Sequence, residues 1–184
     1  MSLKYGILGL LSYGPMTGYE LNRAFHASLA FFWKATMSQV YRELKQMEQK
    51  GWVSATTIIQ HNGKPNKKEY TLTQEGREAF VRWLSGPVVD SDLEVRSAFL
   101  MKIFFSAQNS PMINRENLHR FKEISRKQLS ALQQETAIQE YGQKIQDKRS
   151  VTYWELTRQF GERYYQLCVE WAEMALATVE DQGQ

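Results

Sequence analysis

The sequence contains a single cysteine, Cys168, among its 184 residues. This excludes an intrachain disulfide and a metal site built from several cysteines. The three histidines, His26, His61 and His119, lie too far apart in the sequence to indicate a histidine site. We therefore expect neither a metal ion nor another cofactor.

Long hydrophobic runs are also missing. No segment approaches the roughly 18 apolar residues that a membrane-spanning helix needs, and the N-terminus does not have the pattern of a secretion signal. No phosphate-binding loop, metal-ligand spacing or nucleophile motif of an enzyme occurs. These absences predict a cytoplasmic protein that is not an enzyme and does not enter a membrane.

Charge is unevenly distributed along the chain. Residues 1–86 contain 11 Lys and Arg against 6 Asp and Glu, a net charge of +5, whereas residues 87–184 contain 12 against 14, a net charge of −2. The helix-breaking sequence Ser85-Gly86-Pro87 separates the two parts. We therefore predict two domains, 1–86 and 87–184, and expect only the basic first domain to contact a polyanion.

The segment at about 36–50 predicts an amphipathic helix whose polar face has no acidic residue. On a helical wheel of about 100° per residue, the polar and apolar residues separate into two arcs. The polar arc contains Ser38, Gln39, Arg42, Lys45, Gln46 and Gln49, and the opposite, core-facing side contains Val40, Tyr41, Leu44 and Met47. Gln, Arg and Lys side chains can bond to base edges or phosphates. An ordinary solvated helix face has a similar composition, so the neighbouring segment decides between the two interpretations.

That neighbouring segment, at about 53–72, predicts a β-hairpin with a basic tip. Its first strand is rich in β-branched residues, and Asn62-Gly63 supplies a turn. The lysines of the tip are Lys64, Lys67 and Lys68. Such lysines also keep a sheet edge soluble, but beside this helix they favour contact with DNA. Helix, hairpin and a return helix over 73–84 is the order of a winged helix-turn-helix.

Two shorter helices are expected before this unit, over 3–13 and 18–28. Thr17 with Glu20 forms a capping-box pattern, and Thr36 with Gln39 forms a second one. The aromatic run Phe31-Phe32-Trp33 lies between the second and third helices. It either anchors this turn or lines a ligand cavity, and the structural role is favoured because core aromatic residues are the commoner case.

The C-terminal part predicts three helices, over about 93–107, 114–148 and 152–180. The last begins with a further capping-box pattern, Thr152 with Glu155. Apolar residues recur at three- and four-residue spacing on the two long helices, which favours a dimerisation module. The competing account is a helical hairpin that buries these residues within one chain. The candidate dimerisation residues are Leu118, Phe121, Leu132, Phe160, Tyr164, Leu167 and Trp171.

Several motifs together resemble the PadR-type transcriptional regulators. They are Gly18-Tyr19-Glu20-Leu21, Phe32-Trp33, Ser38-Gln39-Val40-Tyr41-Arg42-Glu43-Leu44, Gly51-Trp52-Val53, Gly63-Lys64-Pro65-Asn66-Lys67-Lys68 and Tyr70-Thr71-Leu72-Thr73. The resemblance covers nearly all of residues 3–86, and the remaining residues are similar to the C-terminal tails of the virulence-activator branch. It implies a mostly α-helical protein, with an N-terminal winged helix-turn-helix followed by a C-terminal α-helical dimerisation domain.

The resemblance also implies a bacterial homodimeric regulator of double-stranded DNA, often a repressor and sometimes relieved by a small aromatic effector. By position, the DNA-facing residues would be Tyr19, Ser38, Gln39, Tyr41, Arg42, Lys64, Lys67 and Lys68, to which the helical wheel adds Lys45. We expect a pseudo-palindromic operator, and an effector near Phe32 and Trp33 between the two domains. The alternative is a winged helix used only for protein contacts, which would tolerate the acidic or apolar recognition face that this chain lacks.

Overall fold

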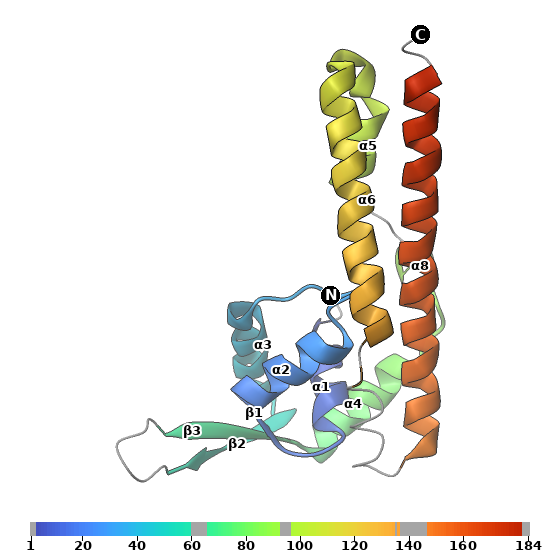
Figure 1. Ribbon diagram of the computed structural model, residues 1–184. Helices are drawn as coiled ribbons and strands as arrows, with labels where there is room; N and C mark the ends of the chain where they lie inside the picture. The colour runs from blue at the N-terminus through green and yellow to red at the C-terminus, as the bar shows by residue number, and fades with distance from the viewer. Residues whose placement is uncertain (1–2, 60–65, 93–96, 135, 137–146, 182–184) are drawn as a thin grey trace. The chain divides into compact units, whose positions relative to one another are not determined.

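The computed structural model describes residues 3–59, 66–92, 97–134, 136 and 147–181 (Figure 1). These residues form two compact units that divide after Pro87. The first unit combines helices with a small antiparallel sheet, and the second is helical.

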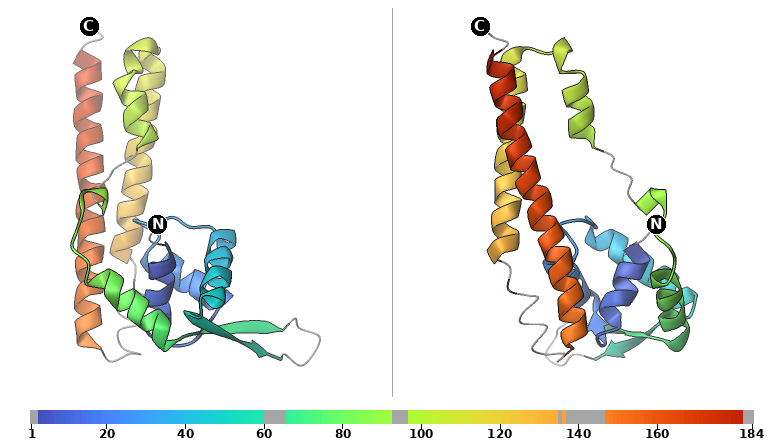
Figure 2. Two further views of the ribbon diagram at one scale, coloured as in Figure 1. Left: turned by 180° about the vertical axis from the view of Figure 1, so that it is seen from behind. Right: turned by 90° about the vertical axis from the view of Figure 1, so that its right-hand side faces the viewer.

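Among its described residues, the first unit contains four helices and three strands. The helices are α1 (Leu3–Leu11), α2 (Gly18–Ser28), α3 (Met37–Gln49) and α4 (Gln74–Leu84), and the strands are β1 (Met16–Thr17), β2 (Val53–Ile58) and β3 (Lys67–Leu72). β3 lies between β1 and β2 and is antiparallel to both. Viewed from behind, β2 and β3 extend away from the helices as a two-stranded hairpin (Figure 2). We call this hairpin the wing.

The core of the first unit lies between α1, α2, α3 and the base of the wing. Its buried side chains are Ile7, Leu8, Leu11, Leu21, Phe25, Ala35, Val40, Leu44, Met47, Val53 and Tyr70. The prediction that Val40, Leu44 and Met47 form the core-facing side of α3 is confirmed. The same prediction is wrong for Tyr41, which is 44% exposed because it lies at the edge of the apolar stripe.

Both predicted capping boxes at the start of α2 and α3 are present. The backbone N–H groups of Thr17 and Thr36 donate to Glu20 Oε2 and Gln39 Oε1, each at 2.8 Å. In return, the backbone N–H groups of Glu20 and Gln39 donate to the two threonine hydroxyls, each at 3.3 Å. These bonds satisfy donors that a helix start leaves without intrahelical partners, and so they fix where each helix begins.

α4 is joined to the base of the wing by a short network of hydrogen bonds. The Thr73 N–H donates to the Trp52 carbonyl at 3.1 Å, and the Thr73 hydroxyl donates to the Gly51 carbonyl at 2.6 Å. The same hydroxyl accepts the Gly76 N–H at 3.0 Å. The first turn of α4 therefore lies directly against the start of β2.

The second unit contains a helical hairpin. The described elements of this unit are the 3-10 turns η1 (Asp90–Asp92) and η2 (Ser106–Gln108) and the helices α5 (Ala98–Phe104), α6 (Pro111–Gln134) and α8 (Lys148–Asp181). The hairpin consists of α6 and α8. α6 and α8 lie side by side and antiparallel (Figures 1 and 2). Among the described residues, no helix combines the length and the apolar composition needed to cross a membrane.

Aromatic stacking and ion pairs hold the hairpin together. Phe99 of α5 stacks on Phe121 of α6 with ring centroids 4.0 Å apart, and Trp171 of α8 meets both rings edge-on. Glu173 of α8 pairs with Arg126 of α6 at 2.6 Å. The apolar contacts are the stronger contribution because the ion pair is exposed and exposed pairs stabilise little.

Two predictions about the C-terminal helices are wrong in detail. The helix expected over 114–148 ends at Gln134 as α6, and the residues that suggested its continuation, Ile138, Tyr141 and Ile145, lie outside the described residues. The helix expected over 93–107 is the shorter α5, which begins after its cap Ser97. Residues 93–96 also lie outside the described part of the chain.

The capping box predicted for Thr152 and Glu155 does not form, because α8 begins four residues earlier. Asp147 occupies the position before the helix, and its carboxylate accepts from the Ser150 hydroxyl at 2.6 Å and the Arg149 N–H at 3.0 Å. Thr152 instead lies inside the helix and donates to the Lys148 carbonyl at 3.0 Å. Aspartate is a preferred residue before a helix start, which explains the earlier beginning.

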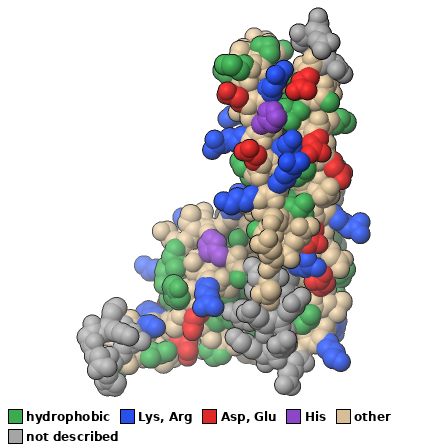
Figure 3. All heavy atoms as spheres, viewed as in Figure 1, with side chains coloured by type: hydrophobic (Ala, Val, Ile, Leu, Met, Phe, Trp, Pro, Cys, Tyr) green, Lys and Arg blue, Asp and Glu red, His purple; other side chains and the backbone are tan. Residues whose placement is uncertain are grey.

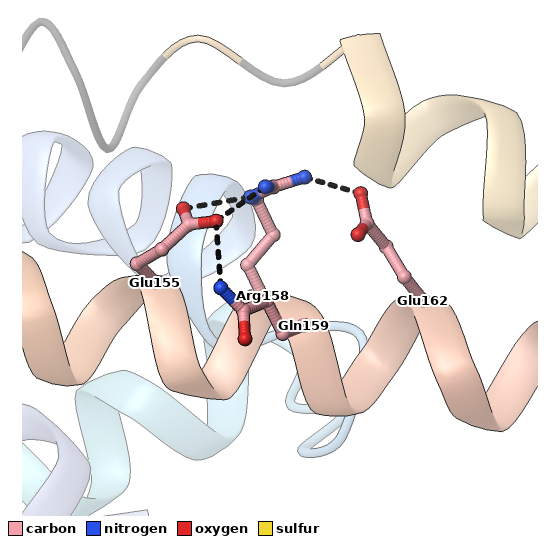
Figure 4. A network of polar contacts seen from close by, with 4 residues as sticks. All are labelled: Glu155, Arg158, Gln159 and Glu162. Carbon is pink, nitrogen blue, oxygen red and sulfur yellow. Dashed lines mark hydrogen bonds and ion pairs between the residues drawn. The ribbon is translucent and has the colours of Figure 1, made fainter.

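Glu155 belongs to a network along one side of α8 (Figure 4). Arg158 donates to Glu155 Oε2 from Nε at 2.9 Å, and it also pairs with Glu162 on the following turn. The hydrogen bond from Arg158 lowers the pKa of the Glu155 carboxyl. Pairs at this spacing support a helix by a few tenths of a kcal/mol each.

We predict that Gly76→Ala destabilises the first unit. A Cβ atom at this position would lie 2.0 Å from the Trp52 carbonyl oxygen, and a backbone atom cannot move aside as a flexible side chain can. Such overpacking typically lowers the free energy of unfolding by about 1–3 kcal/mol, more than the better helix propensity of alanine returns. Urea unfolding followed by circular dichroism measures the loss. Glu75→Ala, at the exposed neighbouring position, is the control and should lower it by less than about 1 kcal/mol.

Candidate nucleic-acid interface

α3 presents its polar arc to solvent. All six predicted arc residues are exposed, namely Ser38, Gln39, Arg42, Lys45, Gln46 and Gln49. At 13 residues the helix is about 20 Å long, and an α-helix fits the major groove of B-DNA. The arc thus offers amide, guanidinium and ammonium donors with no carboxylate among them.

Gln39 combines its position on the arc with the capping role that the Thr36–Gln39 pattern predicted. Its side-chain carbonyl accepts the Thr36 N–H at 2.8 Å and so caps α3. The amide nitrogen at the other end of the same group carries the donors that can meet a base edge. The capping bond holds this amide at the first turn of α3, which restricts the positions it can take.

Tyr41 lies at the contact between α3 and α2. The Tyr41 ring lies against Gly18, where an added Cβ would be only 2.5 Å from a ring carbon. Glycine at this position therefore allows α2 to begin directly beside α3. Tyr19, the next residue, is exposed on the first turn of α2. Sequence reasoning singled out Gly18 only as part of a motif and did not find this contact.

Lys67 and Lys68 are the wing lysines that the structure describes, whereas Lys64 lies outside the described residues. Both are exposed at the start of β3, opposite Ile58 and Thr57 of β2. The ammonium of Lys68 lies 3.8 Å from the carboxylate of Glu48 in the last turn of α3. Basic and acidic side chains also adjoin near the base of the wing in the space-filling view (Figure 3). The Glu48 contact was not predicted, because the two residues are 20 positions apart.

Six of the seven candidate dimerisation residues fall into two groups, and Leu132 belongs to neither. Leu118 is 2% exposed inside the helical hairpin, and Phe121 and Trp171 take part in its aromatic stack. In contrast, Phe160 and Leu167 of α8 are 68% and 62% exposed, and Tyr164 between them is also exposed. Leu132 is half-buried.

The candidate effector residues Phe32 and Trp33 lie in the connection between α2 and α3. Neither belongs to the buried core, and Phe32 is 50% exposed. The Phe32 ring meets Phe31 edge-on at 4.7 Å. The described residues contain no group of three or more His, Cys, Asp or Glu side chains that could hold a metal ion.

Three helices followed by a two-stranded wing and a return helix define a winged helix-turn-helix, a class of DNA-binding domains. Residues 7–82 match the family described as "Transcriptional regulator PadR-like family". Residues 95–180 match the family described as "Virulence activator alpha C-term". The chain belongs to the PadR-like family of transcriptional regulators, which confirms the predicted family and fold.

Two curated regulators are similar to this chain in sequence. A probable transcriptional regulator of Mycobacterium tuberculosis is 44% identical over 88 residues, which cover 48% of this chain and 46% of that protein. The negative transcriptional regulator PadR of Bacillus subtilis is 39% identical over 105 residues, 56% of each chain. The chain thus spans about half the length of the curated relatives it matches.

Solved structures of related regulators cover nearly the whole chain. Bacillus subtilis PadR in complex with operator DNA is 29% identical, covers 97% of this chain and 99% of its own, and has a TM-score of 0.75. The same protein in complex with p-coumaric acid is 26% identical, with coverages of 98% and 99% and a TM-score of 0.70. The Vibrio cholerae virulence activator AphA is 30% identical, with coverages of 98% and 99% and a TM-score of 0.74.

Proposed function

We propose that this PadR-family regulator is a cytoplasmic repressor that binds a pseudo-palindromic operator as a homodimer. The observation that carries the proposal is the exposed, acid-free arc of α3 beside the lysines of the wing. It is supported by the Bacillus subtilis relative, whose name is that of a negative regulator and whose structure contains operator DNA. The proposal assigns no catalytic role to the chain.

In this proposal α3 enters the major groove and reads base edges. Arg42 lies near the centre of the exposed arc and can donate two hydrogen bonds to one guanine. Ser38 and Gln39 lie in the first turn of α3, and Lys45 lies about one turn after Arg42. These side chains extend the contact along the groove in both directions from Arg42. Tyr19 and Tyr41 lie at the edge of this surface, where a hydroxyl group can reach a phosphate.

The wing has a different role. Lys67 and Lys68 carry flexible ammonium groups, which suit phosphate contacts better than base readout. Lys64 belongs to the same proposed set by its position at the tip. Such contacts strengthen binding to any duplex, and each makes the affinity more sensitive to salt.

The homodimer rests on an apolar stripe of α8 that the chain does not bury against α6. This stripe spans about 80° of the helix circumference, and all of its residues are exposed. They are Tyr153, Leu156, Phe160, Tyr164 and Leu167. The buried residues Val169, Ala172 and Leu176 lie on a different face. A second copy of the stripe is a suitable cover for these side chains, because symmetric dimers match two identical surfaces. Two winged helices joined in this way would read two half-sites.

The alternative function is a winged helix that binds protein rather than specific DNA. A protein-binding face would tolerate acidic or apolar residues on the exposed arc of α3, whereas this arc contains neither. Selection of bound sequences from random duplex DNA distinguishes the two functions. We expect an enriched symmetric motif, and its absence would favour the alternative.

We predict that variants of α3 and of the wing affect DNA binding differently. Arg42→Ala should lower affinity for the selected duplex by roughly 1–3 kcal/mol and relax base preference at one position of each half-site. The pair Lys67→Ala with Lys68→Ala should weaken binding to every sequence alike and flatten the salt dependence. Titrations of selected and scrambled duplexes at several salt concentrations measure both effects. If the wing variant lost its preference for the selected duplex while Arg42→Ala kept it, the wing would read the bases and α3 would contact the phosphates, contrary to this prediction.

We predict that Phe160→Asp or Leu167→Asp separates the homodimer. A carboxylate in the centre of an apolar interface would lose its hydration without gaining a partner. Because the second half-site contact would then no longer be intramolecular, affinity for the full site should fall by about 10²–10⁴. Light scattering gives the oligomeric state. Gln166→Asp adds the same charge at an exposed position about 100° around α8 from Leu167 and should leave a dimer.

We also propose that a small aromatic compound relieves repression by contacting Phe32 and Trp33. The exposure of both rings and the complex of the Bacillus subtilis relative with p-coumaric acid support this proposal. The compound must bind the DNA-incompetent state more tightly than the competent state, since equal binding shifts nothing. In a screen of phenolic acids, we expect one that releases the selected duplex from the wild type but less effectively from Trp33→Ala. Unchanged duplex affinity with every phenolic acid would contradict the proposal.

A further inference from the structure

Each of the two described wing lysines has an acidic neighbour on a different helix. Lys68 Nζ lies 3.8 Å from Glu48 Oε1 in the last turn of α3. Glu20, in the first turn of α2, bonds to Thr17, and Thr17 pairs with Glu69 of β3, two residues from Lys67. The hydrogen bonds from Thr17 lower the pKa of the Glu20 carboxyl, and the charge of Lys67 lowers it further. The proposed phosphate-binding groups of the wing are therefore partly neutralised from both helices.

The position of Glu48 is set by buried structure rather than by the ion pair. It follows Met47, which is 1% exposed in the core, so the backbone beneath Glu48 is fixed. On the wing side, Tyr70 is 6% exposed two residues after Lys68 and holds β3 in place. The distance to Lys68 places the Glu48 carboxylate beside β3. Burial raises the pKa of Tyr70, and the Glu48 charge raises it further.

The charge of Glu20 is not needed for its capping role. α3 begins with the same arrangement of hydrogen bonds, and there a neutral glutamine, Gln39, supplies the acceptor at the same 2.8 Å distance. A glutamine would thus cap α2 as well. The cap of α2 therefore does not require the negative charge of Glu20. That charge lies beside a surface that we propose approaches phosphates.

We propose that Glu48 and Glu20 are positioning residues that restrain Lys68 and Lys67 in the free protein and weaken binding to every duplex, whatever its sequence. This inference rests on the proposed function, because it concerns the same contact with DNA. A phosphate must displace each carboxylate before it gains a lysine. Less of the binding energy then comes from the sequence-independent wing contacts, and more must come from the base contacts of α3.

The expected effect is modest because both groups of the Glu48–Lys68 pair are exposed. Exposed pairs are weak, so Glu48→Gln should raise affinity by about two- to five-fold per wing in low salt. The gain should decrease as salt rises, because the screening length falls from about 30 Å at 0.01 M to about 8 Å at 0.15 M. It should be equal for a selected and a scrambled duplex.

A double-mutant cycle separates this mechanism from a general charge effect. Glu43→Gln removes the same charge from the same helix, about 140° around α3 from Glu48. We expect a larger gain from Glu48→Gln than from this control. In a Lys68→Ala background, the gain should fall to that of the control because the restrained lysine is gone. Glu20→Gln should behave in the same way toward Lys67→Ala, with a loss of stability below about 1 kcal/mol, because the glutamine keeps the cap and only the charge at the helix start is lost.

Each result of the cycle has a definite meaning. An equal gain from Glu48→Gln and Glu43→Gln, or a gain that persists without Lys68, would overturn the inference while leaving DNA binding intact. Failure of the wild-type chain to bind any selected duplex would instead overturn the proposed function and this inference with it. The full-length chain and a fluorescent duplex suffice for all of these titrations.

Discussion

Burial of one face of α3 is the constraint on which the rest of the first unit depends. Val40, Leu44 and Met47 lie in the core with Ile7 and Leu8 of α1. Three large side chains on one helix stabilise it by several kcal/mol when water is removed from them. Because these positions follow the helical period, burying them leaves the opposite arc in solvent. The polar surface proposed to meet DNA is thus the geometric complement of the core.

The wing and α4 are tied to that constraint through the end of α3. Gly51, with a positive φ of 71°, ends the helix and turns the chain into β2. Thr73 then bonds to the carbonyl groups of Gly51 and Trp52, which connects α4 to the same corner. A displacement of α3 would therefore move the wing and the return helix as well. This shared corner therefore fixes the direction in which the wing leaves the end of α3.

The sequence predicted those features well that depend on residues close together in the chain. The capping residues Thr17 and Thr36 placed the starts of α2 and α3 correctly, because a cap acts within one turn. The strand β1 was not predicted. Its two residues are extended because they pair with β3, which is distant in the sequence, and no local pattern marks such a pairing. The Thr152–Glu155 pattern misled for a related reason. Threonine followed three residues later by glutamate also occurs inside helices. In α8 the Glu155 carboxylate accepts a hydrogen bond from Arg158 instead of capping the helix.

The candidate site shows the same division between local and tertiary information. Periodicity predicted the exposed arc, but it could not find the contact of Tyr41 with Gly18 or of Lys68 with Glu48, which join different elements. These contacts change how the site should be understood. A count of lysines suggests a wing that attracts phosphate freely, whereas the structure places a carboxylate beside Lys68. Net charge therefore overstates the attraction of the wing for phosphate, because a lysine that already has a carboxylate beside it offers less free positive charge.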